Sequence, residues 1–263
     1  VPALEDLSVP AERIADAIDD RTAAVCLSHV LFRSSYIVDP APVIEKAHAV
    51  GAVVILDGYQ SAGIIPVDVT ALGVDFFVGG CLKWLCGGPG NAFLYTAPWV
   101  KARTRPRLTG WLSRTAPFAF DIEATDVRDD GMAMMNGTPA IPAYYAALPG
   151  LEIIRTVGVD RIRAASQAMT RRLLDLVDDY GYRSVASRDP ERLAGTVAVD
   201  VPEAARVAKT LNARDFVVDY RPGVGIRLSP HFYNTMDEID AMMRELDRVT
   251  RTRDFAPADP AGS

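Results

Sequence analysis

The sequence predicts an α/β protein, with a mostly parallel, doubly wound sheet in its first part and a smaller α+β domain after it. Three observations support this fold class. Short β-branched runs alternate with helical patterns in the first half, as in parallel βαβ units. A long irregular stretch rich in Arg, Thr, Pro and Met then follows at residues 101–142. Helical periodicity returns at residue 143, and no internal repeat indicates a solenoid.

Each element of the first half has a local signal. Residues 23–30 form an apolar run that predicts a buried strand. Asp39 is a candidate N-cap with Pro40 as the first helical residue, and Gly51 ends that helix. The other predicted elements are strands at 53–56, 75–78 and 92–96 and a helical turn at 69–72.

The second half reads as a compact α+β unit. The predicted helices cover 143–157, 159–180 and 203–212 and begin again at Met236; the predicted strands cover 196–199, 216–219 and 225–228. We therefore expect residues 1–140 to belong to the large domain and residues 141–251 to the small one. Residues 252–263 are polar and contain proline, so we expect a flexible tail there.

Composition narrows the class of function. The 263 residues carry a formal charge of −6 without a Lys/Arg run, which argues against a nucleic-acid or membrane-surface partner. No segment approaches 18 uninterrupted apolar residues, and no signal peptide is apparent. The three cysteines do not suggest a disulfide framework or a metal site, so a cytoplasmic enzyme that acts on a small molecule fits best.

Asp57 and Lys83 are the residues most indicative of chemistry. Asp57 ends an apolar strand, and such a carboxylate lies at the ligand-binding edge of a parallel sheet, although it is equally typical of a turn or N-cap. Lys83 follows 26 residues later, after another buried strand, so a right-handed crossover brings both to one edge. A lone lysine is usually solvated surface, but apolar neighbours lower a lysine pKa and favour imine formation.

This pair supplies what pyridoxal 5'-phosphate (PLP) requires of a protein. The lysine binds the aldehyde carbon, and the aspartate keeps the pyridine nitrogen protonated. Gln60, three residues after Asp57, is a candidate for a hydrogen bond to the cofactor's ring oxygen, or else a capping or surface glutamine.

Five segments resemble a known family in the same order along the chain. DGYQSAGIIPVDV and LGVDFFVGGCLKWLCGGPGNAFLY resemble the PLP-lysine region of class V aminotransferases, and LTGW, NGTPAIPA and VDYRPGVGIRLSPHFYN are similar to later segments of kynureninases. The resemblance implies PLP fold type I, a homodimer with shared active sites, and hydrolysis of L-kynurenine or 3-hydroxykynurenine to an anthranilate and alanine. It equally allows another class V reaction, such as transamination, cysteine desulfuration or epimerisation, or a silent remnant of the fold.

The resemblance also implies residue roles. Asp57 would bind the pyridine nitrogen and Lys83 the aldehyde carbon; Ser28 and Trp111 would hold the phosphate end, with Trp111 and Thr138 reaching the neighbouring subunit's site. Arg227 would bind the substrate α-carboxylate, a role that its place on a strand beside a glycine turn supports. The alternative for Arg227 is a structural ion pair.

The chain departs from the kynureninase pattern at two residues and at its beginning. Gln60 stands where kynureninases carry histidine, as in cysteine desulfurases, and Leu82 stands where they carry a phosphate-binding tyrosine. No cysteine follows Cys86 to accept sulfur, which disfavours a desulfurase. Only 56 residues precede Asp57, so we expect the phosphate-binding and ring-stacking segment of the family to be missing by truncation, or to come from another chain.

Overall fold

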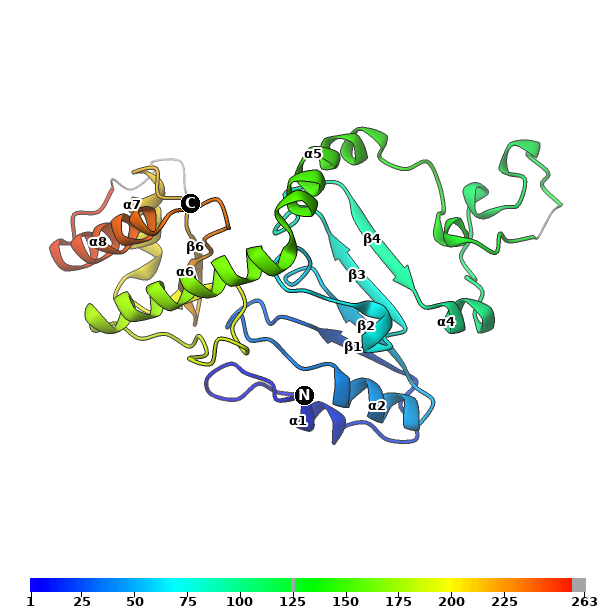
Figure 1. The fold of residues 1–263 in the computed structure, drawn as a ribbon, viewed down its shortest axis with the longest axis horizontal. Helices are drawn as coiled ribbons and strands as arrows, with labels where there is room; N and C mark the ends of the chain where they lie inside the picture. Colours follow the sequence, from blue (N-terminus) through cyan, green and yellow to red (C-terminus); the bar gives the residue numbers. More distant parts are fainter. Residues whose placement is uncertain (124–125, 257–263) are drawn as a thin grey trace.

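The computed structural model describes residues 1–123 and 126–256. A four-stranded sheet forms the first part (Figure 1), in the order β1 (Ala24–Ser28), β2 (Val53–Asp57), β3 (Phe76–Gly80) and β4 (Ala92–Thr96). The first three strands are parallel. β4 runs antiparallel to β3, a direction that the βαβ pattern did not predict. The reason is the short link between them, which contains no helix and therefore makes no crossover.

Burial explains why these residues form the sheet. Val54 and Leu56 of β2 are fully buried, and helix α2 (Ala41–Ala49) covers them with Val43 and Ala47. The helix begins one residue later than expected, with Pro40 rather than Asp39 at the N-cap position. Two further helices flank the sheet, α1 (Ala11–Ala15), which the pattern did not predict, and α3 (Val69–Leu72), found at its predicted bounds.

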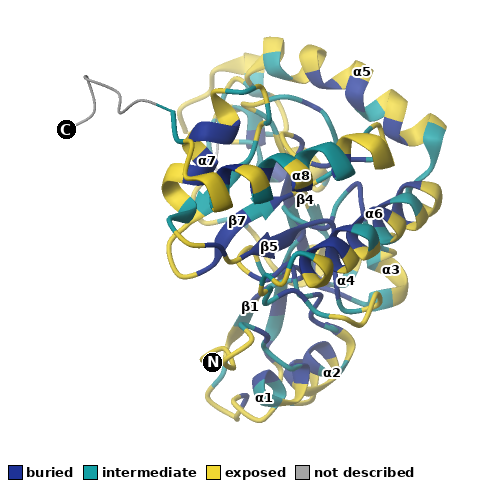
Figure 2. Ribbon diagram, turned by 90° about the vertical axis from the view of Figure 1, so that its left-hand side faces the viewer, coloured by how far each residue is buried: buried dark blue, intermediate teal, exposed yellow. Residues whose placement is uncertain are grey.

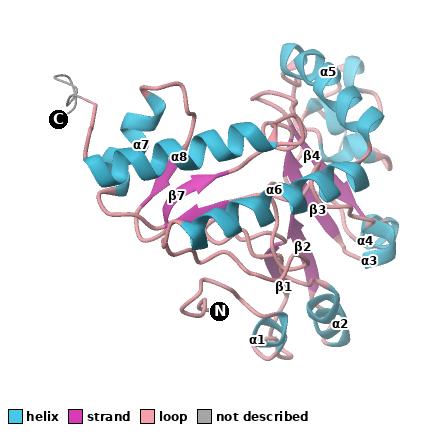
Figure 3. Ribbon diagram, turned by 60° about the vertical axis from the view of Figure 1, so that its left-hand side comes forward, coloured by secondary structure: helices cyan, strands magenta, loops and turns pink. Residues whose placement is uncertain are grey.

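A second, antiparallel sheet lies in the C-terminal half, in the order β5 (Val197–Val199), β7 (Gly225–Leu228) and β6 (Asp219–Arg221). Helices α6 (Val159–Asp179), α7 (Ala204–Asn212) and α8 (Met236–Thr252) pack against it (Figure 3) and share one apolar cluster with it. Figure 2 shows β5 and β7 as buried segments among these helices.

The prediction for β6 was shifted along the chain. The expected strand at 216–219 shares only Asp219 with the observed one. A tight hairpin sets the register, because Arg221 pairs with Gly225 across a turn in which Gly223 adopts a positive φ of 69°. Phe216 and Val218 pack against the core from the loop before the ladder begins.

An extended segment joins the two halves. After α4 (Pro98–Arg103), residues 104–140, called the arm below, contain three short turns of 3₁₀ helix: η1 (Trp111–Ser113), η2 (Pro117–Ala119) and η3 (Gly131–Met134). Figure 1 shows the arm projecting away from both sheets. The chain returns through α5 (Ile141–Val157) and then enters α6.

The chain leaves α8 at Thr252, with Arg253 in the left-handed conformation as the C-cap, and the next residues pack back onto the small domain. Phe255 packs against the small-sheet cluster beneath the guanidinium of Arg206, and the Ala256 amide donates to the Thr210 hydroxyl. The remainder of the predicted tail, residues 257–263, lies outside the described residues. Among the described helices, none combines the length and apolar character needed to cross a membrane.

Candidate functional site

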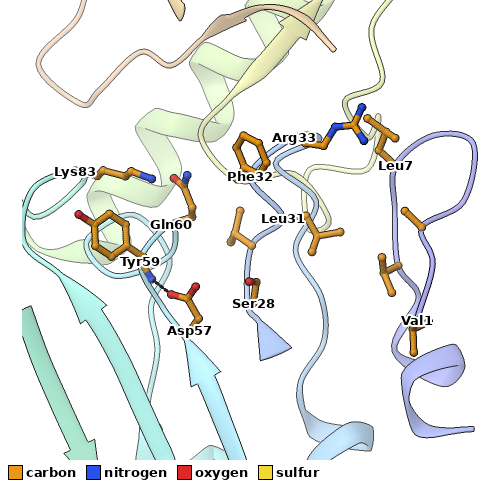
Figure 4. A pocket seen from close by; sticks show the side chains of 13 residues that line it. Val1, Leu7, Ser28, Leu31, Phe32, Arg33, Asp57, Tyr59, Gln60 and Lys83 are labelled. Atoms are coloured by element: carbon orange, nitrogen blue, oxygen red, sulfur yellow. Dashed lines mark hydrogen bonds between the residues drawn. The ribbon is translucent and has the colours of Figure 1, made fainter. Parts of the chain in front are cut away.

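The carboxyl ends of β1 and β2 form the floor of a cavity of about 410 Å³ (Figure 4). Ser28 and Asp57 are the last residues of these strands and pair directly in the sheet register. A cavity of this size falls within the range of small-molecule sites. Its polar lining comes from six residues: Ser28, Arg33, Asp57, Tyr59, Gln60 and Lys83.

A tight turn orients Asp57. Its Oδ1 accepts a hydrogen bond of 2.8 Å from the Tyr59 amide, while the Gly58 amide donates to the carbonyl of Val78 on β3. A side chain at position 58 does not fit, since a Cβ there would lie 2.2 Å from the ring of Phe77. Asp57 is thus both a turn aspartate and a cavity-lining carboxylate, and the two alternatives from the sequence are compatible.

Lys83 reaches the cavity from the loop that follows β3. Its Nζ lies 4.6 Å from the centre of the Tyr59 ring. Although Lys83 is exposed at the cavity mouth, nearby protein atoms remove part of the amine's hydration, and this burial lowers its pKa. The positive charge of Arg227 lowers this pKa further, while Asp57 opposes the change. A larger fraction of the amine is therefore neutral and nucleophilic than for an isolated lysine.

Arg227 projects from β7 toward the same region. Its side chain is 12% exposed, and its Nη1 lies 3.4 Å from Asp219 Oδ2 across the β6–β7 ladder. The guanidinium also lies 5.4 Å from the centre of the ring of Phe32, which lines the cavity. Its buried Nε has no hydrogen-bond partner among the described residues. Arg227 therefore forms an ion pair and retains an unused donor.

His231 connects the Lys83 loop to the loop that follows β7. Its Nδ1 accepts from the Phe232 amide, so the neutral ring carries its proton on Nε2, which lies 3.1 Å from the Trp84 carbonyl oxygen. The Cys86 sulfur lies 3.5 Å from the same nitrogen. Burial raises the pKa of Cys86 and lowers that of His231, which favours a neutral thiol beside a neutral imidazole.

The structure brings together only part of the predicted set. Ser28, Asp57, Gln60 and Lys83 line one cavity. Trp111 and Thr138 belong to the arm, where the Trp111 ring packs against Phe118 and Phe120 at centroid distances of 5.4 and 6.2 Å.

Sequence reasoning missed two aromatic residues of the cavity. Tyr59 and Phe32 both line it, and each lies beside a cationic side chain. The sequence signal that could have identified them is their closeness to strand ends: Tyr59 comes two residues after Asp57, and Phe32 comes four residues after Ser28.

Residues 1–242 match the sequence model of the family described as "Aminotransferase class-V". The chain belongs to the class V aminotransferase family. It is 31% identical over 250 residues to the uncharacterized aminotransferase YcbU of Bacillus subtilis, covering 95% of this chain and 65% of that protein. It is 32% identical over 249 residues to a kynureninase of Bacillus thuringiensis, covering 92% and 58%. The chain thus spans about three fifths of the length of these curated relatives.

Solved structures of two PLP-family enzymes have a similar fold. A cysteine desulfurase from Thermococcus onnurineus superposes with a TM-score of 0.80 at 21% identity, over 92% of this chain and 62% of that one. A cystine C-S lyase in complex with cysteine persulfide superposes with a TM-score of 0.79 at 24% identity, over 94% and 65%. The fold is PLP fold type I, as the sequence predicted.

The cofactor of this class V protein is PLP. The residues present fit it on their own chemistry. PLP carries an aldehyde and a pyridine nitrogen on one small ring, so it needs an amine and a carboxylate close together. Lys83, whose amine has a lowered pKa, and Asp57 line the same cavity and supply these two groups.

Proposed function

We propose that this chain is the catalytic part of a PLP enzyme that acts on an amino acid, and that its reaction is hydrolysis of L-kynurenine or 3-hydroxykynurenine to an anthranilate and alanine. The observation that supports an amino-acid enzyme is the meeting of Lys83 and Asp57 in one cavity with Arg227 nearby. The similarity to kynureninases at 32% identity favours the specific reaction.

Each cavity residue has a role in this proposal. Lys83 would hold the cofactor at its aldehyde carbon and would move the proton at the substrate α-carbon, and Asp57 would hold a proton on the pyridine nitrogen. When bound, PLP supplies a ring that accepts the negative charge left at that carbon. Gln60 binds the ring oxygen, Ser28 binds the phosphate end, and Arg227 binds the substrate carboxylate.

Arg227 suits its role because one donor is free. Its Nε is buried without a partner among the described residues, and an arriving carboxylate would satisfy it. Asp219, which contacts Nη1, is 41% exposed and can turn toward water when the carboxylate binds.

The alternative reaction within class V is sulfur removal from cysteine, since Gln60 matches the desulfurase pattern and desulfurases share the fold. Cys86 argues against it. Burial raises the pKa of this thiol, and its neighbour His231 favours a neutral imidazole, so neither group promotes a thiolate that could receive sulfur.

The assembly that we propose is a homodimer in the cytoplasm. The arm carries Leu108, Phe118, Phe120 and Ile122 at 72% to 90% exposure, a concentration of apolar side chains typical of an interface. A second copy that covers the arm would receive Trp111 and Thr138 at its own phosphate end. The cytoplasmic location rests on three cysteines that are free in the structure.

A reductive labelling experiment tests the cofactor roles. The full chain is incubated with PLP, reduced with borohydride and digested, and we expect pyridoxyl on the Lys83 peptide by mass spectrometry. Asp57→Asn should still be labelled at Lys83 but lose turnover by on the order of a hundred-fold or more, because the ring loses its support. Label on Lys46 or Lys101 instead would contradict the proposal.

A substrate panel tests the reaction. Spectra of the PLP-loaded chain are followed with L-kynurenine, 3-hydroxykynurenine, L-cysteine and L-alanine. We expect a spectral change with both kynurenines, with anthranilate formed from L-kynurenine and 3-hydroxyanthranilate from 3-hydroxykynurenine. A response to cysteine alone would move the assignment to sulfur chemistry, and silence toward all four amino acids in PLP-loaded protein would favour a scaffold.

A further inference from the structure

The Tyr59 ring lies under the amine of the proposed cofactor lysine. Lys83 Nζ lies 4.6 Å from the ring centre, and Figure 4 shows both side chains at the same end of the cavity. An ammonium group within about 6 Å of an aromatic centroid is attracted by the negative face of the ring. The contact involves a residue to which the sequence assigned no role.

The ring is held in this position from two sides. The Tyr59 amide donates to Asp57 Oδ1, which fixes the backbone at the start of the side chain. The ring also lies close to Gly80, where an added Cβ would lie 2.3 Å from Cε2 of Tyr59. The absence of a side chain at position 80 therefore gives the ring its place beneath Lys83.

The charges around Lys83 indicate which form of its amine the ring would stabilise. Burial disfavours the protonated amine, as do the charges of Arg227 and Arg221, whereas the carboxylates of Asp57 and Asp219 favour it. In the proposed reaction the same lysine would carry the proton taken from the substrate α-carbon. An aromatic face favours the ammonium form without adding a competing carboxylate.

We propose that Tyr59 is a positioning residue whose aromatic face holds the Lys83 amine in place and stabilises its protonated form. This inference rests on the proposed role of Lys83 in the reaction. The ionisation of Lys83 can be measured in the cofactor-free chain. The role of Tyr59 can therefore be disproved even if the proposed function is correct.

The test is the pH dependence of amine labelling. The cofactor-free full chain is treated with a small acylating reagent from pH 6 to 11, and acylation of the Lys83 peptide is timed by mass spectrometry. Lys46, Lys101 and Lys209, which are exposed, serve as internal references. The plateau rate at high pH reports access of the reagent to the amine, and the midpoint reports ionisation.

Two variants separate the ring from the hydroxyl. Tyr59→Leu keeps apolar bulk but removes the ring, so we expect its midpoint to move to lower pH and its labelling near pH 7 to quicken by about two- to five-fold, with the plateau unchanged. Tyr59→Phe keeps the ring and should match the wild type. Gly80→Ala, which displaces the ring without altering it, should resemble Tyr59→Leu and provides a second route if that variant does not fold.

The outcomes decide the proposal. A midpoint that moves only in Tyr59→Leu and Gly80→Ala supports it. An unchanged or raised midpoint in Tyr59→Leu, a change in its plateau alone, or an equal change in Tyr59→Phe would overturn it, since each assigns the contact to packing or to the hydroxyl. Borohydride labelling of Lys83 in the wild type is measured alongside and reports separately on the proposed function.

Discussion

Two cations face the cavity region, and their proximity has a consequence for ligand choice. The charge of Arg227 disfavours the protonated form of Lys83 and so lowers its pKa, and the carboxylates of Asp57 and Asp219 oppose this change. A ligand with a carboxylate relieves this repulsion, whereas a cationic ligand adds to it. At the residue scale the site therefore selects anionic groups near Arg227.

Arg227→Lys tests this selection. Lysine keeps the charge but loses the planar fork, so we expect KM for the amino-acid substrate to rise by about ten- to a hundred-fold with a smaller change in kcat. Steady-state kinetics of the PLP-loaded chain measures both. Arg221→Lys is the matched control, because Arg221 contacts the same Asp219 at 3.2 Å and lies on the exposed side of the hairpin. Equal effects in both variants would contradict the role of Arg227.

The sequence alone predicted that Asp57 and Lys83 lie near each other, because each follows a strand of a parallel sheet and the ends of such strands meet at one edge. This prediction needs no knowledge of the residues around them. Tyr59 and Phe32 could not be predicted in the same way. Their importance depends on distances of 4.6 and 5.4 Å to cations that arrive from other loops and strands. No local pattern encodes such a distance.

At the element scale, Asp75 joins three segments at the opposite edge of the large sheet. This buried carboxylate, just before β3, accepts from the Val54 amide at 2.7 Å, from His48 Nε2 at 2.8 Å and from Trp99 Nε1 at 2.9 Å. Burial acts to raise the pKa of Asp75, but these hydrogen bonds together bring it below the ordinary value. The carboxylate thus links β2, α2 and α4.

Asp75→Asn should destabilise the chain. The NH₂ group of asparagine would face N–H groups that now donate to the carboxylate, and it cannot accept their hydrogen bonds. We therefore expect the free energy of unfolding at pH 7 to fall by about 2–4 kcal/mol. Because the folded pKa of Asp75 is lowered, its contribution is present above the unfolded value of 3.8 and is lost as pH falls through the folded pKa. The difference between variant and wild type should therefore shrink in acid.

Urea unfolding followed by tryptophan fluorescence at pH 7 and at pH 3.5 measures this difference. Asp20→Asn, at an exposed position, is the control and should leave stability within about 0.5 kcal/mol of the wild type. A difference of the same size at both pH values would show that the carboxylate charge is not the cause.

Local patterns located most elements, since β4, α3 and β7 lie at their predicted bounds. The errors had non-local causes. The direction of β4 follows from a link without a helix, and the register of β6 follows from the hairpin turn at Gly223. Helix α1 is only five residues long, which is too short to give a clear periodicity.

At the scale of the whole molecule, the arm was predicted only as irregular chain. Its three 3₁₀ turns are too short to give a clear periodic pattern, and the proposed dimer would cover its exposed aromatic side chains. For the same reason the sequence could assign Trp111 and Thr138 to a phosphate site only by resemblance.

The proposed dimer gives a direct prediction. Light scattering after size-exclusion chromatography should find twice the chain mass, and Phe120→Asp should shift the protein to the monomer, because it places a charge in an apolar contact. Val217→Asp is the control: Val217 is 91% exposed but lies beside the small sheet. A wild-type monomer at micromolar concentration, or equal behaviour of both variants, would reject the arm as the interface.

The imidazole of His231 has a further consequence for how the site meets its ligand. It connects the loop that carries Lys83 to the residues that follow Arg227, through a hydrogen bond of 3.1 Å to the Trp84 carbonyl oxygen. This hydrogen bond restrains the backbone segments that carry the two cations, so less conformational entropy would be lost in ordering these segments when a ligand binds.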